Sequence, residues 1–211
     1  MLTAAHCLYG TAAAERKVSV GLHRFNYSAS DAAEAGATLR VAAYHAHPAY
    51  DATSLANDLA LLRFAGPVPA GVAARPVTLD DGGGGGNHTA PGPAFVIGWG
   101  SLDVACKDYG SPLLREVAAP LLAPKRCASA EGSKSFDGSK QLCAGDRESG
   151  KWHEVGCGDS GGPLLVRAAD GTPVQVGIVS WGYGDAPDVY TKVAAYRSWI
   201  SACIAGQCDK P

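Results

Sequence analysis

The chain has 211 residues, enough for one large all-β domain. Its 27 glycines and 13 prolines exceed average usage and indicate many turns, while a hydrophobic content of 46% excludes wholesale disorder. The net charge is −2 and no basic run exceeds two residues, which argues against a nucleic-acid partner or an anionic membrane surface. No apolar stretch approaches the roughly 20 residues that cross a bilayer.

Short β-prone runs bounded by turn residues recur along the chain. They are Lys17–Leu22, Leu39–Tyr44, Asp58–Phe64, Ala94–Gly98, Arg115–Ala118, Pro163–Arg167, Gln175–Trp181 and Asp188–Lys192. Only the tail has a helical pattern, because apolar residues from Val193 to Ile204 follow i, i+3, i+4 and i+7 spacing. Many short strands with one terminal helix predict an all-β barrel or sandwich rather than alternating βαβ units.

Residues 81–93 contain five consecutive glycines followed by a Pro-rich stretch. This composition predicts an exposed, flexible connector that buries no core. A phosphate-binding loop is the alternative, but it requires a preceding strand, a following helix and a Lys-Ser/Thr pair, none of which is present.

The seven cysteines are widely and irregularly spaced, which favours disulfides in an oxidising compartment. None has zinc-site spacing, so no metal or cofactor is indicated. The sequons at Asn26 and Asn87 agree with secretion and predict glycosylation. The sequence at Met1 lacks signal-peptide features, and the odd cysteine count leaves one without an internal partner. We therefore expect the true N-terminus to be missing.

The most specific segment runs from Gly158 to Pro163. Its glycines allow a tight turn around Ser160, and the N–H groups of Gly158 and Ser160 can then point at a developing oxyanion. The alternative is a glycine-rich turn between strands. All six histidines precede Ser160, which excludes the Ser-acid-His order of a nucleophile elbow and leaves the order His, acid, Ser.

Two further segments fit that order, with His6 in Thr-Ala-Ala-His-Cys and Asp58 in Asp-Leu-Ala-Leu-Leu. Taken singly, His6 reads as a core histidine and Asp58 as a strand cap. Together with Ser160 they follow the chain order that a His-Asp-Ser mechanism uses. At this point the sequence resembles the trypsin/chymotrypsin-like serine proteases, and further matches cover essentially the whole chain: His47-Pro48, Gly98-Trp99-Gly100, Cys143-Ala144-Gly145, Ser180-Trp181-Gly182 and Val189-Tyr190-Thr191-Lys192-Val193.

The resemblance implies a fold of two six-stranded antiparallel β-barrels with a C-terminal α-helix and an active site between the barrels. On that pattern, residues 1–80 are the remnant of an incomplete first barrel and residues 81–93 are the connector. Residues 94–192 then form the second barrel, and residues 193–205 form the helix.

The resemblance also implies roles. His6 is the general base, Asp58 orients its imidazole and Ser160 is the nucleophile. Ser180 is expected near Asp58, and the strand of Ser180, Trp181 and Gly182 pairs with the substrate backbone. Asp159 is the partner of an N-terminal ammonium made by activation cleavage. The implied protein is a secreted, monomeric endopeptidase that cleaves polypeptides and is bound by protein protease inhibitors.

The specificity pocket departs from the family, because Cys157 directly precedes Gly158 instead of lying one residue earlier. The pocket floor is therefore Glu154 or Val155, depending on how the shift is aligned. Asp188 takes the place of a small glycine on the pocket wall. An acidic side chain there favours Arg or Lys before the scissile bond, and a surface-turn Asp is the alternative.

The family pattern implies a Cys127–Cys143 disulfide. Cys157 has lost its usual partner, so Cys106–Cys157 is the replacement we expect, and Cys203–Cys208 closes a terminal loop. Cys7 is then left over, since its family partner lies upstream of His6.

Two rival hypotheses remain open, a non-catalytic protease homologue acting as a binding module and an inactive truncated fragment. Such homologues usually lose a triad residue, and here all three are present. Without an activating amine we expect the chain as given to be inactive, with Asp159 turned toward solvent as in a zymogen.

Overall fold

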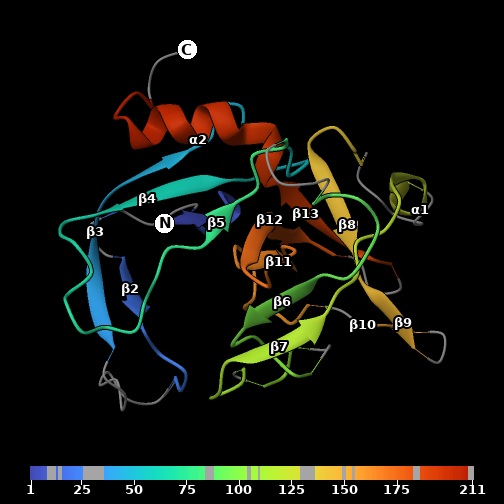
Figure 1. The fold of residues 1–211 in the computed structure, drawn as a ribbon, viewed down its shortest axis with the longest axis horizontal. Helices are drawn as coiled ribbons and strands as arrows, with labels where there is room; N and C mark the ends of the chain where they lie inside the picture. The colour runs from blue at the N-terminus through green and yellow to red at the C-terminus, as the bar shows by residue number, and fades with distance from the viewer. Residues whose placement is uncertain are drawn as a thin grey trace.

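The structure is a computed structural model that describes residues 1–8, 13, 16–25, 36–83, 88–103, 106–108, 110–128, 136–148, 151–153, 155–182 and 186–208. Most of its regular elements are β-strands (Figure 1). The strands are β1 Leu2–Thr3, β2 Lys17–Val20, β3 Ala37–Ala46, β4 Ala60–Phe64, β5 Thr78–Leu79, β6 Phe95–Gly98, β7 Arg115–Ala118, β8 Gln141–Ala144, β9 Asp146–Glu148, β10 Lys151–His153, β11 Pro163–Arg167, β12 Pro173–Trp181 and β13 Asp188–Lys192. The helices are η1 His6–Leu8, α1 Pro124–Ala128, η3 Val193–Tyr196 and α2 Arg197–Ile204, of which the η elements are 3₁₀.

The first sheet is antiparallel, with the strand order β1-β4-β3-β2. β3 is long enough to pair with β2 through its first half and with β4 through its second half. The β3–β4 register shifts between Val41 and Ala43, and such an irregularity bends a strand. Apolar residues on this sheet's inner side form a small core around Leu8 and Val41.

The second sheet has the order β7-β6-β11-β12-β13-β8, and all of these pairings are antiparallel. Its ends meet because Leu121, just after β7, bridges Ala144 in β8, and the Leu122 N–H donates to the Cys143 carbonyl at 3.0 Å. The six strands therefore close on themselves. β5 adds to β12 in parallel, which fastens the chain leaving the first sheet to the second.

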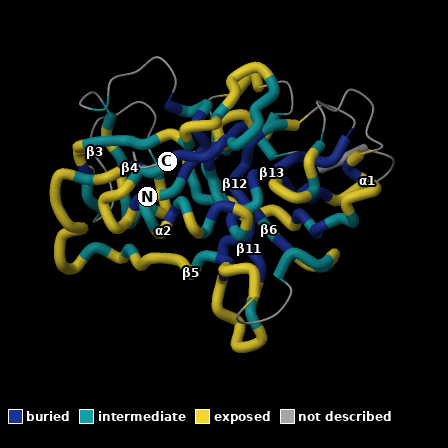
Figure 2. The backbone as a smooth tube through the Cα atoms, turned by 90° about the horizontal axis from the view of Figure 1, so that it is seen from above, coloured by how far each residue is buried: buried dark blue, intermediate teal, exposed yellow. Residues whose placement is uncertain are grey.

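Buried residues concentrate in the second sheet, as the dark segments along β11, β12 and β13 show (Figure 2). A separate core joins the two sheets to the C-terminal helices. It contains Ala4, Leu59, Ile178, Val193, Tyr196 and Ile200. Because Ala4 and Leu59 lie close in sequence to His6 and Asp58, this core fixes the segments that carry both candidate residues.

Each of the eight β-prone runs overlaps a strand, and α2 lies in the expected terminal segment. Two antiparallel sheets with a C-terminal helix agree with the double-barrel pattern, while six strands in the first barrel stay a prediction. The expectation that only the tail is helical is wrong, because α1 is also helical. Five residues beginning at Pro124 are too few for an apolar period to register. Within the described residues, no helix has the length and apolarity to cross a membrane.

Candidate active site

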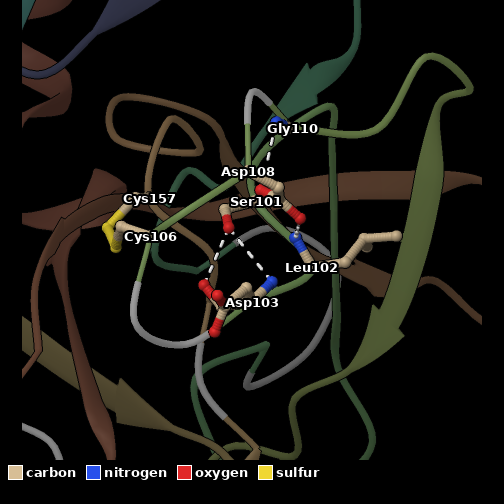
Figure 3. The surroundings of a disulfide bond; sticks show 7 residues. All are labelled: Ser101, Leu102, Asp103, Cys106, Asp108, Gly110 and Cys157. Carbon is tan, nitrogen blue, oxygen red and sulfur yellow. Dashed lines mark hydrogen bonds between the residues drawn. A yellow bond between two sulfur atoms is a disulfide. The ribbon is translucent and has the colours of Figure 1, made fainter.

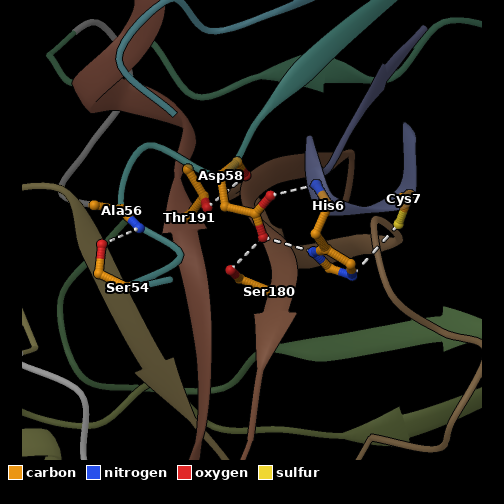
Figure 4. A network of polar contacts seen from close by, with 7 residues as sticks. All are labelled: His6, Cys7, Ser54, Ala56, Asp58, Ser180 and Thr191. Carbon is orange, nitrogen blue, oxygen red and sulfur yellow. Dashed lines mark hydrogen bonds and ion pairs between the residues drawn. The ribbon is translucent and has the colours of Figure 1, made fainter. Parts of the chain in front are cut away.

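Asp58, two residues before β4, is fully buried, and hydrogen-bond donors surround its carboxylate (Figure 4). Oδ1 accepts a hydrogen bond from the His6 backbone N–H at 2.9 Å, and Oδ2 lies 2.7 Å from His6 Nδ1. The Ser180 hydroxyl also donates to Oδ2, at 2.6 Å. Thr191 Oγ1 donates to the Asp58 backbone carbonyl at 2.8 Å. A buried carboxylate satisfied on both oxygens holds one fixed orientation.

His6 lies in η1, where its backbone and its ring both face Asp58. The hydrogen bond to Asp58, and secondarily the contact with Cys7, raises the pKa of His6 above its usual value of 6.5, although burial opposes the shift. With Nδ1 turned to Asp58, Nε2 is the ring nitrogen left to accept a proton. Nε2 lies 3.5 Å from the Cys7 sulfur.

Ser160 is exposed on the turn that precedes β11. Gly158 and Gly161 have φ of 96° and 78°, in the left-handed region that favours glycine. A Cβ on Gly161 would lie 2.3 Å from Thr3 Oγ1 and 3.2 Å from the Cys7 sulfur. The turn that carries Ser160 therefore packs directly against the segment that carries His6.

A cavity of about 390 Å³ adjoins Ser160. Its wall includes Ser180, Trp181 and Gly182, and Asp188 is part of the same lining. Asp188 is buried, its Oδ2 accepts the Val155 N–H at 2.8 Å, and a Cβ on Gly182 would lie 2.1 Å from its Oδ1. The structure thus places Ser160 and the acidic group on one cavity.

Val155, one of the two alternatives for the pocket floor, lines this cavity beside Asp188. The other alternative, Glu154, lies outside the described residues, as do both sequon asparagines, Asn26 and Asn87.

Asp159 is half-buried, and its Oδ1 accepts the Gly100 N–H at 2.8 Å. The expectation that this carboxylate turns toward solvent is therefore wrong. The physical reason is the space left by two glycines, since a Cβ on Gly98 or Gly100 would lie 1.9 or 2.4 Å from an Asp159 oxygen. Burial raises the pKa of Asp159 despite the backbone hydrogen bonds that it accepts.

The structure contains the disulfides Cys106–Cys157, Cys127–Cys143 and Cys203–Cys208. Cys7 is the cysteine of the described chain that remains a thiol. Thr191 is a residue whose role the sequence did not reveal. Its hydroxyl donates to the Asp58 carbonyl, 133 residues earlier in the chain. The signal available in the sequence was the family motif around Tyr190, which includes Thr191.

A histidine bonded to a buried acid, with an exposed serine on an adjoining glycine-rich turn, is the arrangement found in serine proteases. A family model described as Trypsin matches residues 1–200, and the chain belongs to the trypsin family.

Several curated proteins are similar along 95% of this chain. Coagulation factor XII of Cavia porcellus is 38% identical over 212 residues, and this chain spans 34% of its length. Trypsin-1 of Astacus astacus is 34% identical, with 82% of its length covered. Trypsin Blo t 3 of Blomia tropicalis is 33% identical, with 71% covered. The chain thus spans about a third of the factor XII relatives and most of the trypsins.

Proposed function

We propose that the chain is a serine endopeptidase that hydrolyses peptide bonds with His6, Asp58 and Ser160. The observation that carries this proposal is the buried Asp58 carboxylate, which bonds both the backbone N–H and Nδ1 of His6. These two bonds leave Nε2 as the general base; it lies 3.5 Å from the Cys7 sulfur, against which the turn bearing Ser160 also packs. The imidazolium formed during reaction stays beside a negative charge.

In the proposed reaction, Ser160 Oγ attacks the substrate carbonyl while His6 Nε2 takes the hydroxyl proton. The N–H groups of Gly158 and Ser160 stabilise the oxyanion of the tetrahedral intermediate. Collapse of that intermediate transfers the proton from His6 to the leaving amine and leaves an acyl group on Ser160. A water molecule then attacks this ester with His6 again acting as base.

We propose that the cavity beside Ser160 takes a basic side chain before the scissile bond, with Asp188 as its anion. The support is the cavity lining, which combines one buried carboxylate with apolar Val155 and Val179. Lys and Arg match this environment because both have an apolar stem and a cationic head. The strand of Ser180 to Gly182 is proposed to pair with the substrate backbone, and Glu154 keeps its place as the alternative anion.

Asp159 is proposed to receive an N-terminal ammonium on activation. Among the described residues, its half-buried carboxylate forms no ion pair, and it accepts hydrogen bonds from backbone N–H groups. Apolar side chains of Val96, Val117 and Val179 line the same cavity, which suits an aliphatic first residue. Insertion of an ammonium there would compensate a charge that burial disfavours.

We further propose that the protein is secreted, glycosylated at Asn26 and Asn87, made as a zymogen, and monomeric. Its expected partners are polypeptide substrates and protein protease inhibitors. Three disulfides in one chain support an oxidising compartment, where such bonds persist.

A fluorophosphonate probe tests the central proposal, because it reacts only with an activated serine. The chain is incubated with the probe, alone and with a dipeptide that has a free aliphatic N-terminus, and labelling is read by mass spectrometry. We expect labelling at Ser160, increased by the dipeptide, and none in Ser160→Ala. Absence of labelling under both conditions, or equal labelling of Ser160→Ala, would favour a non-catalytic homologue.

A further inference from the structure

The Cys106–Cys157 disulfide joins the loop that follows β6 to the turn before Ser160 (Figure 3). Cys157 is the residue immediately before Gly158, and it lines the cavity next to Ser160. The bond joins it to a loop 51 residues away, in the segment that follows Gly98-Trp99-Gly100. It therefore connects two segments whose relative position sets where the Gly158 N–H points.

Two non-covalent contacts fasten the same two segments. The Ser101 N–H donates to the Cys157 carbonyl at 2.8 Å. The Gly100 N–H donates to Asp159 Oδ1, also at 2.8 Å. A Cβ on Gly156 would lie 2.1 Å from the Ser101 carbonyl oxygen, so the two backbones are in direct contact. The turn of residues 156–159 is thus held to Gly100, Ser101 and Cys106 at successive positions.

Described residues on both sides of Cys106 are held by local hydrogen bonds. The Ser101 hydroxyl donates to the Asp103 carbonyl at 2.7 Å and accepts the Asp103 N–H at 3.0 Å. The Asp108 carboxylate accepts the N–H groups of Leu102 and Gly110, each at 3.1 Å. A disulfide whose far end is held by hydrogen bonds restrains the position of Cys157, whereas a disulfide to a flexible segment would not.

The backbone of the turn at residues 156–159 is one that a covalent bond would help to hold in place. Gly158 is in the left-handed region at φ 96°, where a glycine backbone has large conformational freedom to lose. Its other main anchor is the Asp159 carboxylate, which is half-buried and disfavoured in its charged form by burial. An oxyanion donor is effective only when it is oriented before the charge develops.

We propose that the Cys106–Cys157 disulfide is a positioning element for the oxyanion hole, acting through the Gly158 peptide in parallel with Asp159. This inference rests on the proposed function for its kinetic consequence. Its structural consequence, that the bond restrains residues 156–159, is independent of whether the protein is catalytic.

The test compares two paired variants that each remove one disulfide. Cys106→Ala/Cys157→Ala removes the proposed positioning disulfide, here called the clamp. Cys127→Ala/Cys143→Ala is the matched control, because that disulfide lies in another part of the second sheet. The readouts are kcat and KM on a peptide amide, affinity for a peptide boronic acid that forms a tetrahedral adduct, and affinity for benzamidine, a small cation for the cavity.

Removing this disulfide is expected to lower kcat and boronic-acid affinity by a similar factor of about 10 to 100. This is less than the ~10²–10³ lost with a whole oxyanion donor, because the Gly158 N–H is misoriented rather than removed. KM and benzamidine affinity should change little, and the control pair should retain kcat. Unchanged kcat, or an equal loss of kcat in both paired variants, would overturn the proposal.

Hydrogen exchange of the peptide covering residues 155–163 gives a readout that needs no activity. Faster exchange there in the Cys106/Cys157 variant, but not in the Cys127/Cys143 variant, supports the clamp. Equal exchange in the parent and both variants contradicts it. A parent chain that fails to label with fluorophosphonate refutes the proposed function alone, because exchange still decides the role of the disulfide.

Discussion

The four-stranded first sheet and the closed second sheet carry different parts of the site. The first sheet and the turn beside it supply His6 and Asp58, while the second supplies the turn with Ser160, the cavity wall and Asp188. The donors to Asp58 cross between the sheets, since Ser180 lies in β12 and Thr191 in β13. Residues of the second sheet therefore hold Asp58 in place, although Asp58 leads into a strand of the first sheet.

The largest expected effect on kcat comes from removing Ser160, supplied by the second sheet, or His6, supplied beside the first sheet. With an activated chain, Ser160→Ala or His6→Ala should lower kcat by several orders of magnitude, leaving ~10³–10⁴-fold catalysis over water. Ser201→Ala, an exposed change on α2, is the control for serine removal. Steady-state kinetics on a peptide amide measure the effect, and near-full activity in either variant would refute the triad.

Asp58→Asn tests whether the buried charge acts through His6. The Asp58 hydrogen bond raises the pKa of His6 above 6.5, so kcat/KM should rise with pH through a midpoint above that value. The variant should lose about 10⁴ in kcat, because the amide favours the wrong imidazole tautomer, and its midpoint should move down. A parent midpoint at or below 6.5 would contradict this coupling.

The same pair should make stability depend on pH in a defined direction. Because the folded-state pKa of His6 is raised, its stabilising contribution is complete below pH 6.5 and disappears as pH rises through the folded-state pKa. Thermal unfolding of the parent and of Asp58→Asn across this range separates the pair from other titrating groups.

Asp188→Asn tests the second sheet alone, because it removes charge while keeping size and an acceptor for Val155. Cleavage after basic residues should fall by the equivalent of ~2–5 kcal/mol, with little change after uncharged residues.

The hydrogen bond to Asp188 also predicts which basic residue the parent prefers. Since Oδ2 already accepts the Val155 N–H, a bidentate guanidinium fits less well than an ammonium, and the parent should prefer Lys to Arg. Peptide-library profiles measure both, and an unchanged basic preference would move the role to Glu154.

The smallest effect tests the donor that crosses between the sheets. Thr191→Val leaves the buried Asp58 carbonyl without this partner and should cost ~1–3 kcal/mol of unfolding free energy, with a loss of kcat far below that of Asp58→Asn. Tyr196→Phe, which removes a 3.1 Å bond to Asn57 nearer the surface, should cost less. A larger stability loss in Tyr196→Phe would argue against the anchoring role of the second sheet.

The sequence could predict the elements whose residues alternate or repeat over several positions. β3, β4, β11, β12 and β13 contain such runs, and each coincides with an expected strand. β1 and β5 could not be found, because two residues carry no period and their pairing is decided by distant strands. The parallel pairing of β5 with β12 in particular follows from the path of the chain between sheets rather than from any local pattern.

For the candidate site, the sequence could propose His6, Asp58 and Ser160 together, because a His-Asp-Ser mechanism restricts their order along the chain. The burial of Asp159 was not, since it depends on the room above Gly98 and Gly100, which only the packed turn reveals. The pairing of Cys106 with Cys157 is likewise undetermined by spacing, as several connectivities are open to seven cysteines.

The bonds that assemble the acid and base have a consequence for how the protein matures. The hydrogen bonds to Asp58 join residues 52, 122 and 133 positions apart along the chain. Such distant contacts are costly in loop-closure entropy and form together, late in folding. On the proposed function, a partly folded or nascent chain would therefore lack a positioned general base and would not cleave neighbouring chains that are still unfolded.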